Sequence, residues 1–319
     1  MKAIIFSNYG EPSVLKLQEV AKPIPKDDEI LIKVFATAVN SADWRLRKPD
    51  PILVRLFLGL IKPRIQSLGG VLSGEIEAIG VNVTRFKVGD QVFGSTGFNF
   101  GAYAEYKCLK ETAILSIKPS NITHNQAATI SFGGLTALDF LNRVEIKEGQ
   151  KVLIYGASGA VGTAGIQLAK YFKAEVTGVC STKNLELVKN LGATNVIDYT
   201  KSDVLTQTNL YDVVFVTINK LSLKQAISLV KPGGKLILSD ASFKDMLLSV
   251  FYSKFGKIKV HSGVCKEIQG DLDFLRDRLS QGQYQPVIDR VFKLEQMVEA
   301  HTFVEAGHKA GNVAISVVE

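Results

Sequence analysis

A glycine-rich segment has the residue types and spacing of a dinucleotide-binding turn. Residues 151–155 predict a buried strand and residues 160–172 an amphipathic helix. Between them, Gly156 permits a tight turn, Gly159 lets a pyrophosphate approach the backbone, and Gly162 lets helix and strand pack closely. The N–H groups and positive dipole at the start of the helix would bind the phosphates. The predicted contacts are Gly156, Ala157, Ser158, Gly159, Ala160, Val161 and Gly162. A packing turn without a ligand is the alternative.

The residues that follow the next predicted strand indicate which nicotinamide cofactor binds. NAD-binding versions of this fold place an acidic residue there to hold the ribose hydroxyls. This chain has Ser181, Thr182 and Lys183 instead, so no acid in this segment would repel a 2′-phosphate. Two hydroxyl donors and a cation favour NADPH over NADH. The alternative is that a hydroxyl caps the following helix and that Lys183 is solvated.

Size and composition favour a folded chain with two domains and a small-molecule ligand. The 319 residues are 46% apolar and 22% charged, which is enough to bury a large core. The net charge of +7 suits an anionic ligand. Lysine and arginine are nevertheless scattered along the whole chain, without a basic stripe interleaved with aromatic residues. This distribution argues against nucleic acid as a partner.

Cysteine usage and the absence of targeting patterns indicate a cytoplasmic location. The three cysteines are far apart and form no CxxC pair: Cys108, Cys180 and Cys265. Neither a disulfide framework nor a cysteine-rich zinc site is therefore expected. Met1 leads directly into a strand-like segment rather than a signal sequence. The most apolar stretch, residues 51–61, is too short to span a bilayer and contains Arg55, so we expect a helix or lid beside a pocket and no stable membrane insertion.

The secondary structure that positions these residues falls into two patterns. The first 120 residues predict short strands separated by turns, as in a compact barrel-like domain, at residues 3–6, 29–38, 71–79, 91–93 and 102–108. A helix over residues 125–144 then precedes six strands, at residues 151–155, 175–179, 195–197, 213–216, 235–238 and 258–262. Helices over residues 160–172, 183–191 and 222–230 alternate with them. This alternation predicts a doubly wound parallel sheet of six strands.

The tail of the chain is too short for a domain of its own. It predicts a helix over residues 270–281, a strand at 287–292, a helix over 294–306 and a strand at 312–317. We therefore expect it to return to the N-terminal β-rich part.

Four groups of motifs, in this order along the chain, resemble one known family. They are Ala38-Val-Asn-Ser-Ala-Asp-Trp44; Gly74-Glu-Ile-Glu-Ala-Ile-Gly80 with Lys87-Val-Gly-Asp-Gln-Val-Phe-Gly94; Gly134-Leu-Thr-Ala137 with the glycine-rich turn; and Leu191-Gly-Ala193 with Val196-Ile-Asp-Tyr199. Together they resemble the quinone oxidoreductase branch of the medium-chain dehydrogenase/reductase superfamily over nearly the whole chain.

This resemblance implies an α/β fold and its division into domains. Residues 1–122 would form a GroES-like catalytic domain and residues 123–264 a Rossmann NADPH-binding domain with its six-stranded parallel sheet. Residues 265–319 would return to the catalytic domain. The active site would lie in the cleft between the domains, and family members usually pair as homodimers through the edge strand of the Rossmann sheet, here residues 258–262.

The resemblance also implies roles for residues outside the glycine-rich turn. Asn40 and Thr136 would approach the nicotinamide, and Tyr199 the adenine ribose and phosphate region. Asn312 would contact the cofactor from the returning tail, although many relatives have lysine there. Trp44 would form an aromatic wall for a flat substrate or serve only in packing. Arg45 would bind an anionic substrate group or stand in solvent, and we favour solvent.

The residues at the metal-binding positions of zinc-dependent relatives predict a zinc-independent protein. Those relatives have cysteine where this chain has Asn40, and Gly-His-Glu where it has residues 69–71, Gly-Gly-Val. No thiolate, imidazole or carboxylate is left to bind zinc. Residues 94–106 contain no cysteine, so the structural zinc lobe is missing as well. The four histidines stand alone in separate segments: His124, His261, His301 and His308.

The combined pattern predicts an oxidoreductase that transfers hydride from NADPH to a quinone or an α,β-unsaturated carbonyl compound. Such acceptors delocalise the incoming charge and need no Lewis acid, so positioning supplies most of the catalysis. Asn40 or a cofactor ribose hydroxyl would stabilise the developing oxyanion. We expect Asp43 to order its loop, because nothing near it in the sequence indicates a raised pKa. The alternatives are an enoyl-thioester reductase, with residues 51–63 lining an acyl slot, and a non-catalytic NADPH-binding or structural protein.

Overall fold

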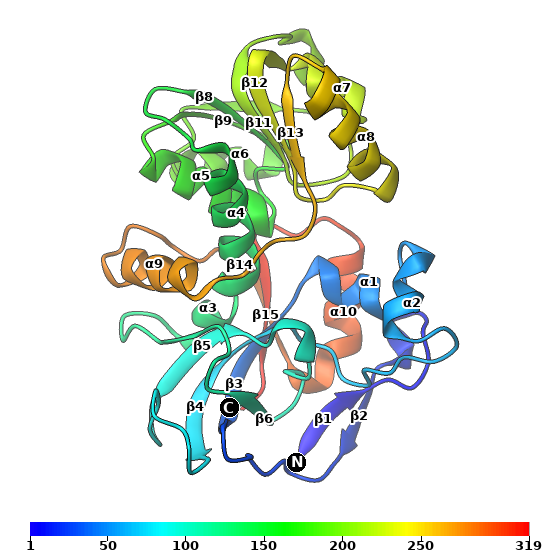
Figure 1. The fold of residues 1–319 in the computed structure, drawn as a ribbon, viewed down its shortest axis with the longest axis vertical. Coiled ribbons are helices and arrows are strands. Elements are labelled where there is room, and N and C mark those ends of the chain that lie inside the picture. The colour runs from blue at the N-terminus through cyan, green and yellow to red at the C-terminus, as the bar shows by residue number, and fades with distance from the viewer. Residues whose placement is uncertain (319) are drawn as a thin grey trace. The chain divides into compact units, whose positions relative to one another are not determined.

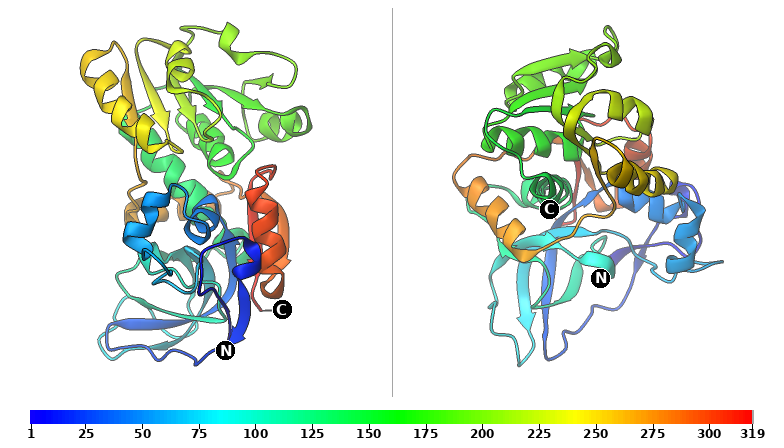
Figure 2. Two further views of the ribbon diagram at one scale, coloured as in Figure 1. Left: turned by 90° about the vertical axis from the view of Figure 1, so that its right-hand side faces the viewer. Right: turned by 45° about the horizontal axis from the view of Figure 1, so that its top comes forward.

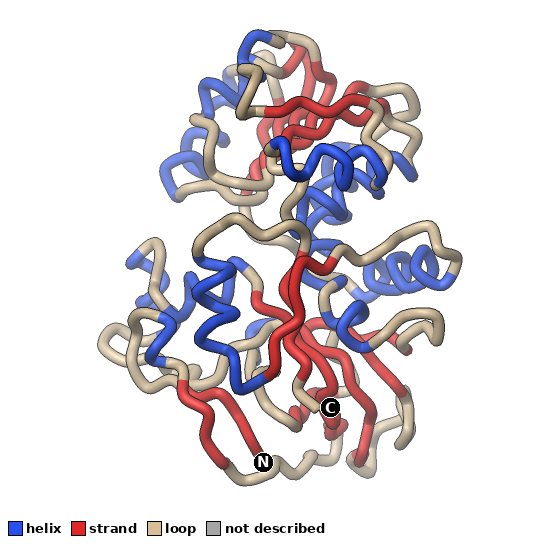
Figure 3. Tube along the Cα trace, turned by 180° about the vertical axis from the view of Figure 1, so that it is seen from behind, coloured by secondary structure: helices blue, strands red, loops and turns tan. Residues whose placement is uncertain are grey.

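Two compact units make up the chain (Figure 1). The computed structural model describes residues 1–318. The first unit contains residues 1–132 and the chain from Ile268 onward, and the second contains Gly133–Glu267. The strands of the two units, drawn in red in Figure 3, belong to separate sheets.

The first unit is built on a seven-stranded sheet. Its strands follow the order β14-β15-β3-β4-β5-β7, and β6 pairs with β3. The strands of this unit are β1 (Lys2–Ile5), β2 (Lys16–Glu19), β3 (Glu29–Val39), β4 (Val71–Ile79), β5 (Gln91–Ser95), β6 (Tyr106–Lys110), β7 (Leu115–Ile117), β14 (Ile288–Lys293) and β15 (Asn312–Ser316). β1 and β2 form a separate antiparallel pair. Ile30, Ile32 and Val34 alternate along β3 and are buried in one core cluster, as expected for a strand with one face on the core.

The end of the chain completes this sheet. β15 pairs antiparallel with β3, with Val313 opposite Val39 and Ala314 opposite Ala38. The helices of the first unit are α1 (Ser41–Arg47), α2 (Arg55–Leu58), α3 (His124–Ala128), α9 (Gln269–Ser280) and α10 (Met297–Glu305), with short 3-10 turns at Pro12–Val14, Ile52–Val54, Gly97–Asn99 and Leu294–Gln296. α10 buries Met297 and Val304 in the same core cluster as Val313. The tail therefore packs as part of the first unit.

The second unit is a doubly wound parallel sheet. Its strand order is β10-β9-β8-β11-β12-β13, and all pairings are parallel. The strands are β8 (Lys151–Tyr155), β9 (Glu175–Cys180), β10 (Asn195–Asp198), β11 (Tyr211–Val216), β12 (Val230–Leu238) and β13 (Lys259–Ser262). The helices are α4 (Ile130–Val144), α5 (Ala160–Tyr171), α6 (Leu185–Asn190), α7 (Leu223–Ser228) and α8 (Phe243–Phe255), with 3-10 turns at Thr182–Asn184 and Val204–Thr206. Helices cover both faces of this sheet (Figure 2). The predicted fold class is confirmed.

The compact units divide the chain at different residues from the predicted domains. The sequence predicted boundaries at 122/123 and 264/265, whereas the units meet at 132/133 and 267/268. His124, at the start of α3, explains the first difference. Its Nδ1 lies 2.9 Å from the Ser73 hydroxyl in β4, and its ring centroid lies 4.7 Å from that of Phe35 in β3. At the second boundary, the Lys266 N–H donates to Asp139 in α4 at 2.9 Å.

Local elements also differ from their predicted bounds. The predicted helix 125–144 is two helices, because the Thr129 side chain caps α3 by donating to the Gln126 carbonyl at 2.8 Å. α8 was not predicted, since its apolar residues do not form one buried stripe: Leu247 is 61% exposed and Phe251 58%. Among residues 1–318, no helix combines the length and apolarity needed to cross a membrane.

Candidate functional site

The glycine-rich turn connects β8 to α5, and two of its three glycines are required by the packing of the protein itself. Gly156 has a positive φ of 87°, and a Cβ there would lie 2.6 Å from the Thr217 hydroxyl. A Cβ at Gly162 would lie 2.2 Å from the Gly156 carbonyl oxygen, so this glycine packs against the turn rather than the strand. A Cβ at Gly159 would meet only that same oxygen, at an ordinary 3.5 Å. The surface at Gly159 is therefore open to a ligand.

The N-terminus of α5 presents backbone donors beside this opening. Gly159 is the extended N-cap residue, and the first intrahelical bond runs from the Thr163 N–H to its carbonyl at 2.8 Å. The N–H groups of Ala160, Val161 and Gly162 precede that bond, so they belong to the turn that lacks intrahelical acceptors. The Ala157 N–H, in contrast, donates to Val179 at 3.0 Å. The residues of this turn fit a pyrophosphate held at a helix N-terminus.

Asn184 joins the glycine-rich turn to the end of β9. Its side-chain Nδ2 donates to the Ser158 hydroxyl at 3.0 Å and to the Ser181 hydroxyl at 3.4 Å, and the residue is buried. Two predicted site residues are thereby brought together. Sequence reasoning missed Asn184 because it follows Ser181-Thr182-Lys183 in a segment that predicts only the start of a helix.

An acidic residue from the neighbouring strand, which sequence reasoning did not place here, lies beside this segment. Asp198 ends β10, opposite Cys180 of β9. The Thr182 hydroxyl donates to Asp198 at 2.6 Å, and the Thr200 hydroxyl donates to its other oxygen at 2.7 Å. The hydrogen bond from Thr182 lowers the pKa of Asp198. Thr182 has therefore already donated its only hydroxyl proton, so only Ser181 and Lys183 of the predicted trio can donate to a 2′-phosphate.

The other two predicted residues of the second unit lie on separate elements. Tyr199 follows Asp198 and is 54% exposed, and its N–H donates to Cys180 at 3.1 Å. Thr136 is half-buried in α4, where its side chain hydrogen-bonds Cys265. Tyr199 is thus near Ser181, while Thr136 lies on the helix before β8.

In the first unit, the Asp43 carboxylate hydrogen-bonds both the Asn40 segment and the Gly69-Gly70 segment. These are the segments that hold metal ligands in zinc-dependent relatives. Asn40 follows β3 and is 3% exposed. Its N–H donates to the Asp43 carboxylate at 2.8 Å, and the Gly69 N–H donates to the other oxygen at 3.1 Å. Asp43 therefore orders the loop, as expected. The expectation of an unremarkable pKa was wrong, because burial raises the pKa of Asp43 to about 6.

Trp44 and Arg45 stack on one another within α1. The Arg45 guanidinium lies 5.3 Å from the centroid of the Trp44 ring, within cation–π range. Trp44 packs against the core cluster that contains Val39. Packing is thus one role of Trp44, and Arg45 is half-buried rather than standing fully in solvent.

Asn312 begins β15 and carries an acceptor without a hydrogen-bond donor among the described residues. Its N–H and its Nδ2 both donate to the Val287 carbonyl, at 2.9 and 3.0 Å. Its Oδ1 is buried and has no hydrogen-bond partner among the residues that the structure describes. A carboxamide or hydroxyl donor would satisfy it.

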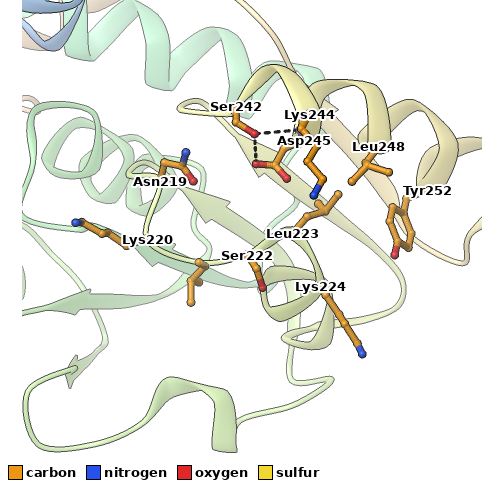
Figure 4. A pocket seen from close by; sticks show the side chains of 11 residues that line it. Asn219, Lys220, Ser222, Leu223, Lys224, Ser242, Lys244, Asp245, Leu248 and Tyr252 are labelled. Carbon is orange, nitrogen blue, oxygen red and sulfur yellow. Dashed lines mark hydrogen bonds between the residues drawn. The ribbon is translucent and has the colours of Figure 1, made fainter. Parts of the chain in front are cut away.

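A pocket that the sequence did not reveal lies between α7 and α8 (Figure 4). It has a volume of about 580 Å³ and follows the carboxyl ends of β11 and β12, the end at which parallel sheets bind ligands. The Ser242 hydroxyl caps α8, donating to the Asp245 carboxylate at 2.6 Å and accepting from its N–H at 3.1 Å. The side chains of Lys220 and Lys224 point away from the other lining residues in Figure 4.

In the part of the chain that the structure describes, residues that could hold a metal do not gather in either unit. Within residues 1–318, no three His, Cys, Asp or Glu side chains are placed to bind one ion. Each of the two histidines nearest the Asn40 and Gly70 segments has protein partners: His124 contacts Ser73, and His301 contacts Arg47.

Comparison with known proteins places the chain in a family. Residues 26–119 match the alcohol dehydrogenase GroES-like domain, and residues 191–315 match a family described as zinc-binding dehydrogenase. The chain is 31% identical to the chloroplastic NADPH-dependent alkenal/one oxidoreductase of Arabidopsis thaliana, over 99% of this chain and 79% of that protein. It is 31% identical to the quinone oxidoreductase of Sus scrofa, over 94% of this chain and 93% of that protein.

A solved structure shows the same relationship. The quinone oxidoreductase of Coxiella burnetii is 30% identical, with a TM-score of 0.90 over 100% of this chain and 99% of that chain. The chain therefore belongs to the medium-chain dehydrogenase/reductase superfamily, in its quinone oxidoreductase branch. It is an oxidoreductase of that type, as the motifs predicted.

Proposed function

We propose that this protein is an NADPH-dependent, metal-independent oxidoreductase that transfers hydride to quinones or α,β-unsaturated carbonyl compounds. The observation that carries the proposal is the opening at Gly159, where no packing contact explains the glycine and the first turn of α5 presents its N–H groups. Relatives named for NADPH-dependent alkenal/one reduction and for quinone reduction support the cofactor and the acceptor class.

The cofactor site divides into a pyrophosphate part and a 2′-phosphate part. The α5 N-terminus holds the pyrophosphate, and Ser181 and Lys183 hold the 2′-phosphate. The nearby Lys201 charge partly offsets the negative charge of Asp198, and both carboxylate oxygens accept hydrogen bonds from the Thr182 and Thr200 hydroxyls. Thr136, Tyr199 and Asn312 make the remaining cofactor contacts.

The first unit supplies the groups that act on the acceptor. NADPH, when bound, supplies the hydride. Asn40 stabilises the negative charge that develops on the acceptor oxygen, and Trp44 with Arg45 borders the acceptor. Conjugation spreads the charge within the acceptor, so positioning by the protein replaces a metal Lewis acid. We propose the first unit as the catalytic domain, the second as the NADPH-binding domain, and the cytoplasm as the location.

An activity panel tests this proposal. NADPH oxidation should be measured with quinones, enones, enals, enoyl thioesters and acetaldehyde, and NADP+ reduction should be measured with ethanol. We expect turnover with quinones, enones or enals and none with the simple alcohol or aldehyde. Turnover restricted to enoyl thioesters would support the alternative acceptor, for which the apolar residues Ile52, Leu56 and Leu60, all more than 60% exposed, would form the slot. Tight NADPH binding without any turnover would identify a binding protein.

Metal independence gives a separate prediction. Asn40 and Gly70 stand at the positions of two zinc ligands, so exhaustive chelation should leave the reductase rate unchanged. The measurement combines elemental analysis with the rate before and after chelation. Stoichiometric zinc, with inactivation by the chelator and rescue by added zinc, would contradict the proposal.

The edge of the second unit predicts a homodimer. β13 is one of the two edge strands of the six-stranded sheet, and an unpaired edge offers its backbone groups to another chain. Pairing of two β13 strands would cover this edge. Light scattering at micromolar concentration should give twice the monomer mass of 34.8 kDa. A monomeric wild-type protein would refute the pairing.

A further inference from the structure

Five side chains of the first unit form a continuous chain of polar contacts that ends at the carboxylate beside Asn40. They come from α1, from α10 and from the loop before β6: Glu305, Arg47, His301, Tyr103 and Asp43. Arg47, Tyr103 and His301 are 0% exposed and Asp43 is 2% exposed. Polar groups buried this deeply are retained only when they are mutually satisfied.

The chain can be followed from the protein surface inward. Glu305 pairs with Arg47, which also donates to the Gly10 carbonyl. The Arg47 Nε lies 3.4 Å from Nδ1 of His301, and Nε2 of His301 lies 3.2 Å from the Tyr103 hydroxyl. The Tyr103 hydroxyl in turn hydrogen-bonds the Asp43 carboxylate.

Arginine sets the direction of every hydrogen bond in this chain, because guanidinium can only donate. Nδ1 of His301 must therefore accept from Arg47, which places the ring proton on Nε2. Nε2 then donates to Tyr103, and Tyr103 donates to Asp43. The neutral imidazole is consistent with burial and the Arg47 charge, which lower the pKa of His301 to about 3. The Asp43 carboxylate thus accepts three hydrogen bonds, one from the Tyr103 hydroxyl and two from backbone N–H groups.

We propose that these residues are positioning residues for the reduction, and that only an ionised Asp43 holds the Asn40 segment in its active geometry. This inference rests on the proposed function, in which Asn40 acts on the acceptor. A protonated carboxyl cannot accept equally well from the Asn40 N–H, the Gly69 N–H and the Tyr103 hydroxyl. Protonation would loosen the Asn40 segment without changing the cofactor-binding turn of the second unit.

The direction of the pH effect follows from the groups that face Asp43. Burial raises its pKa to about 6, and the donors at Asn40, Gly69 and Tyr103 oppose that rise. The Arg47 charge lies beyond the Tyr103 hydroxyl, and His301 is neutral. Turnover should therefore fall as the pH decreases through about 6. Removal of the Tyr103 donor should raise the pKa of Asp43, which moves this loss of turnover to higher pH.

Tyr103→Phe tests the inference against a matched control, Tyr284→Phe. Tyr284 is a second buried tyrosine of the first unit, and burial raises its pKa as well. We expect Tyr103→Phe to lower kcat near neutral pH by roughly ten-fold or more. The fall of kcat on the acid side of the pH profile (its acid limb) should also move to higher pH. The dissociation constant for NADPH should not change. Tyr284→Phe should keep the acid limb of the wild type. Circular dichroism at each pH separates loss of turnover from unfolding.

A second pair of variants covers the case in which Tyr103→Phe folds poorly. His301→Gln keeps one acceptor and one donor in the chain, whereas His301→Leu removes both. The glutamine variant should retain more turnover than the leucine variant at equal NADPH affinity. Equal acid limbs in Tyr103→Phe, Tyr284→Phe and wild type, or equal turnover in the two His301 variants, would overturn the inference.

A readout without turnover separates this inference from the proposed function. Carbon NMR of 13C-labelled aspartate, with the Asp43 signal assigned through Asp43→Asn, follows the ionisation of this carboxyl directly. It should titrate near pH 6 in the wild type and at higher pH in Tyr103→Phe. An Asp43 signal with the same titration in both proteins would refute the inference even if reductase activity is found. A shifted titration without any reductase activity would contradict the proposed function and the positioning role, but not the polar chain.

Discussion

Replacement of Asn40 by alanine should lower turnover with an enone or quinone by about a hundred-fold, the scale of losing one oxyanion donor. Asn40 is buried at the end of β3, and its N–H is fixed by Asp43 at 2.8 Å. The backbone that carries its side-chain amide is therefore fixed beside Asp43. NADPH affinity should change little, because the pyrophosphate turn lies in the second unit. Steady-state rates at saturating NADPH, with cofactor affinity from fluorescence titration, measure both quantities.

Asn40→Ser is the matched control for this prediction. Serine retains a hydroxyl donor on a shorter side chain, so this variant should keep more turnover than alanine. If Asn40→Ala weakens NADPH binding and leaves turnover intact at saturation, then Asn40 contacts the cofactor and does not stabilise the oxyanion.

Replacement of Lys183 by alanine should weaken NADPH by roughly ten- to a hundred-fold and leave NADH nearly unchanged. A charge-assisted hydrogen bond is worth about 1.5 to 3 kcal/mol, which corresponds to this range. Lys183 is exposed, so solvent screening favours the lower end. Because Thr182 already donates to Asp198, Ser181→Ala should cost more NADPH affinity than Thr182→Val.

Lys189 on α6 provides the control for the change in charge. It is exposed and lies away from the end of β9, so Lys189→Ala should affect neither cofactor. Equal losses for NADPH and NADH in Lys183→Ala would show that Lys183 does not recognise the 2′-phosphate.

Most of the fold could be predicted because its signals are local. Continuous apolar strands such as β8, the glycine-rich turn after it, and the alternation of helices and strands identify a doubly wound sheet directly from sequence. α8 and the start of β12 were missed for a physical reason. α8 exposes several large apolar residues, and β12 runs through Pro232-Gly233-Gly234, a sequence that normally ends an element.

The parts of the candidate site that were missed depend on contacts between distant residues. Asp198 lies beside Thr182 only because β10 pairs with β9, and Asn184 joins two serines across the turn. Arg47 and His301 are 254 residues apart, so no local pattern connects them. The raised pKa of Asp43 likewise follows from burial by segments that sequence alone does not place around it.

An isotope label can follow the proposed hydride transfer from the cofactor to the acceptor. NADPH deuterated at the transferable C4 position is mixed with chelator-treated protein and an enone, and the product is analysed by mass spectrometry and NMR. We expect one deuterium on the carbon β to the carbonyl, at the same rate with and without the chelator. A product without deuterium, or deuterium on the carbonyl carbon in a reaction that requires zinc, would contradict this proposal.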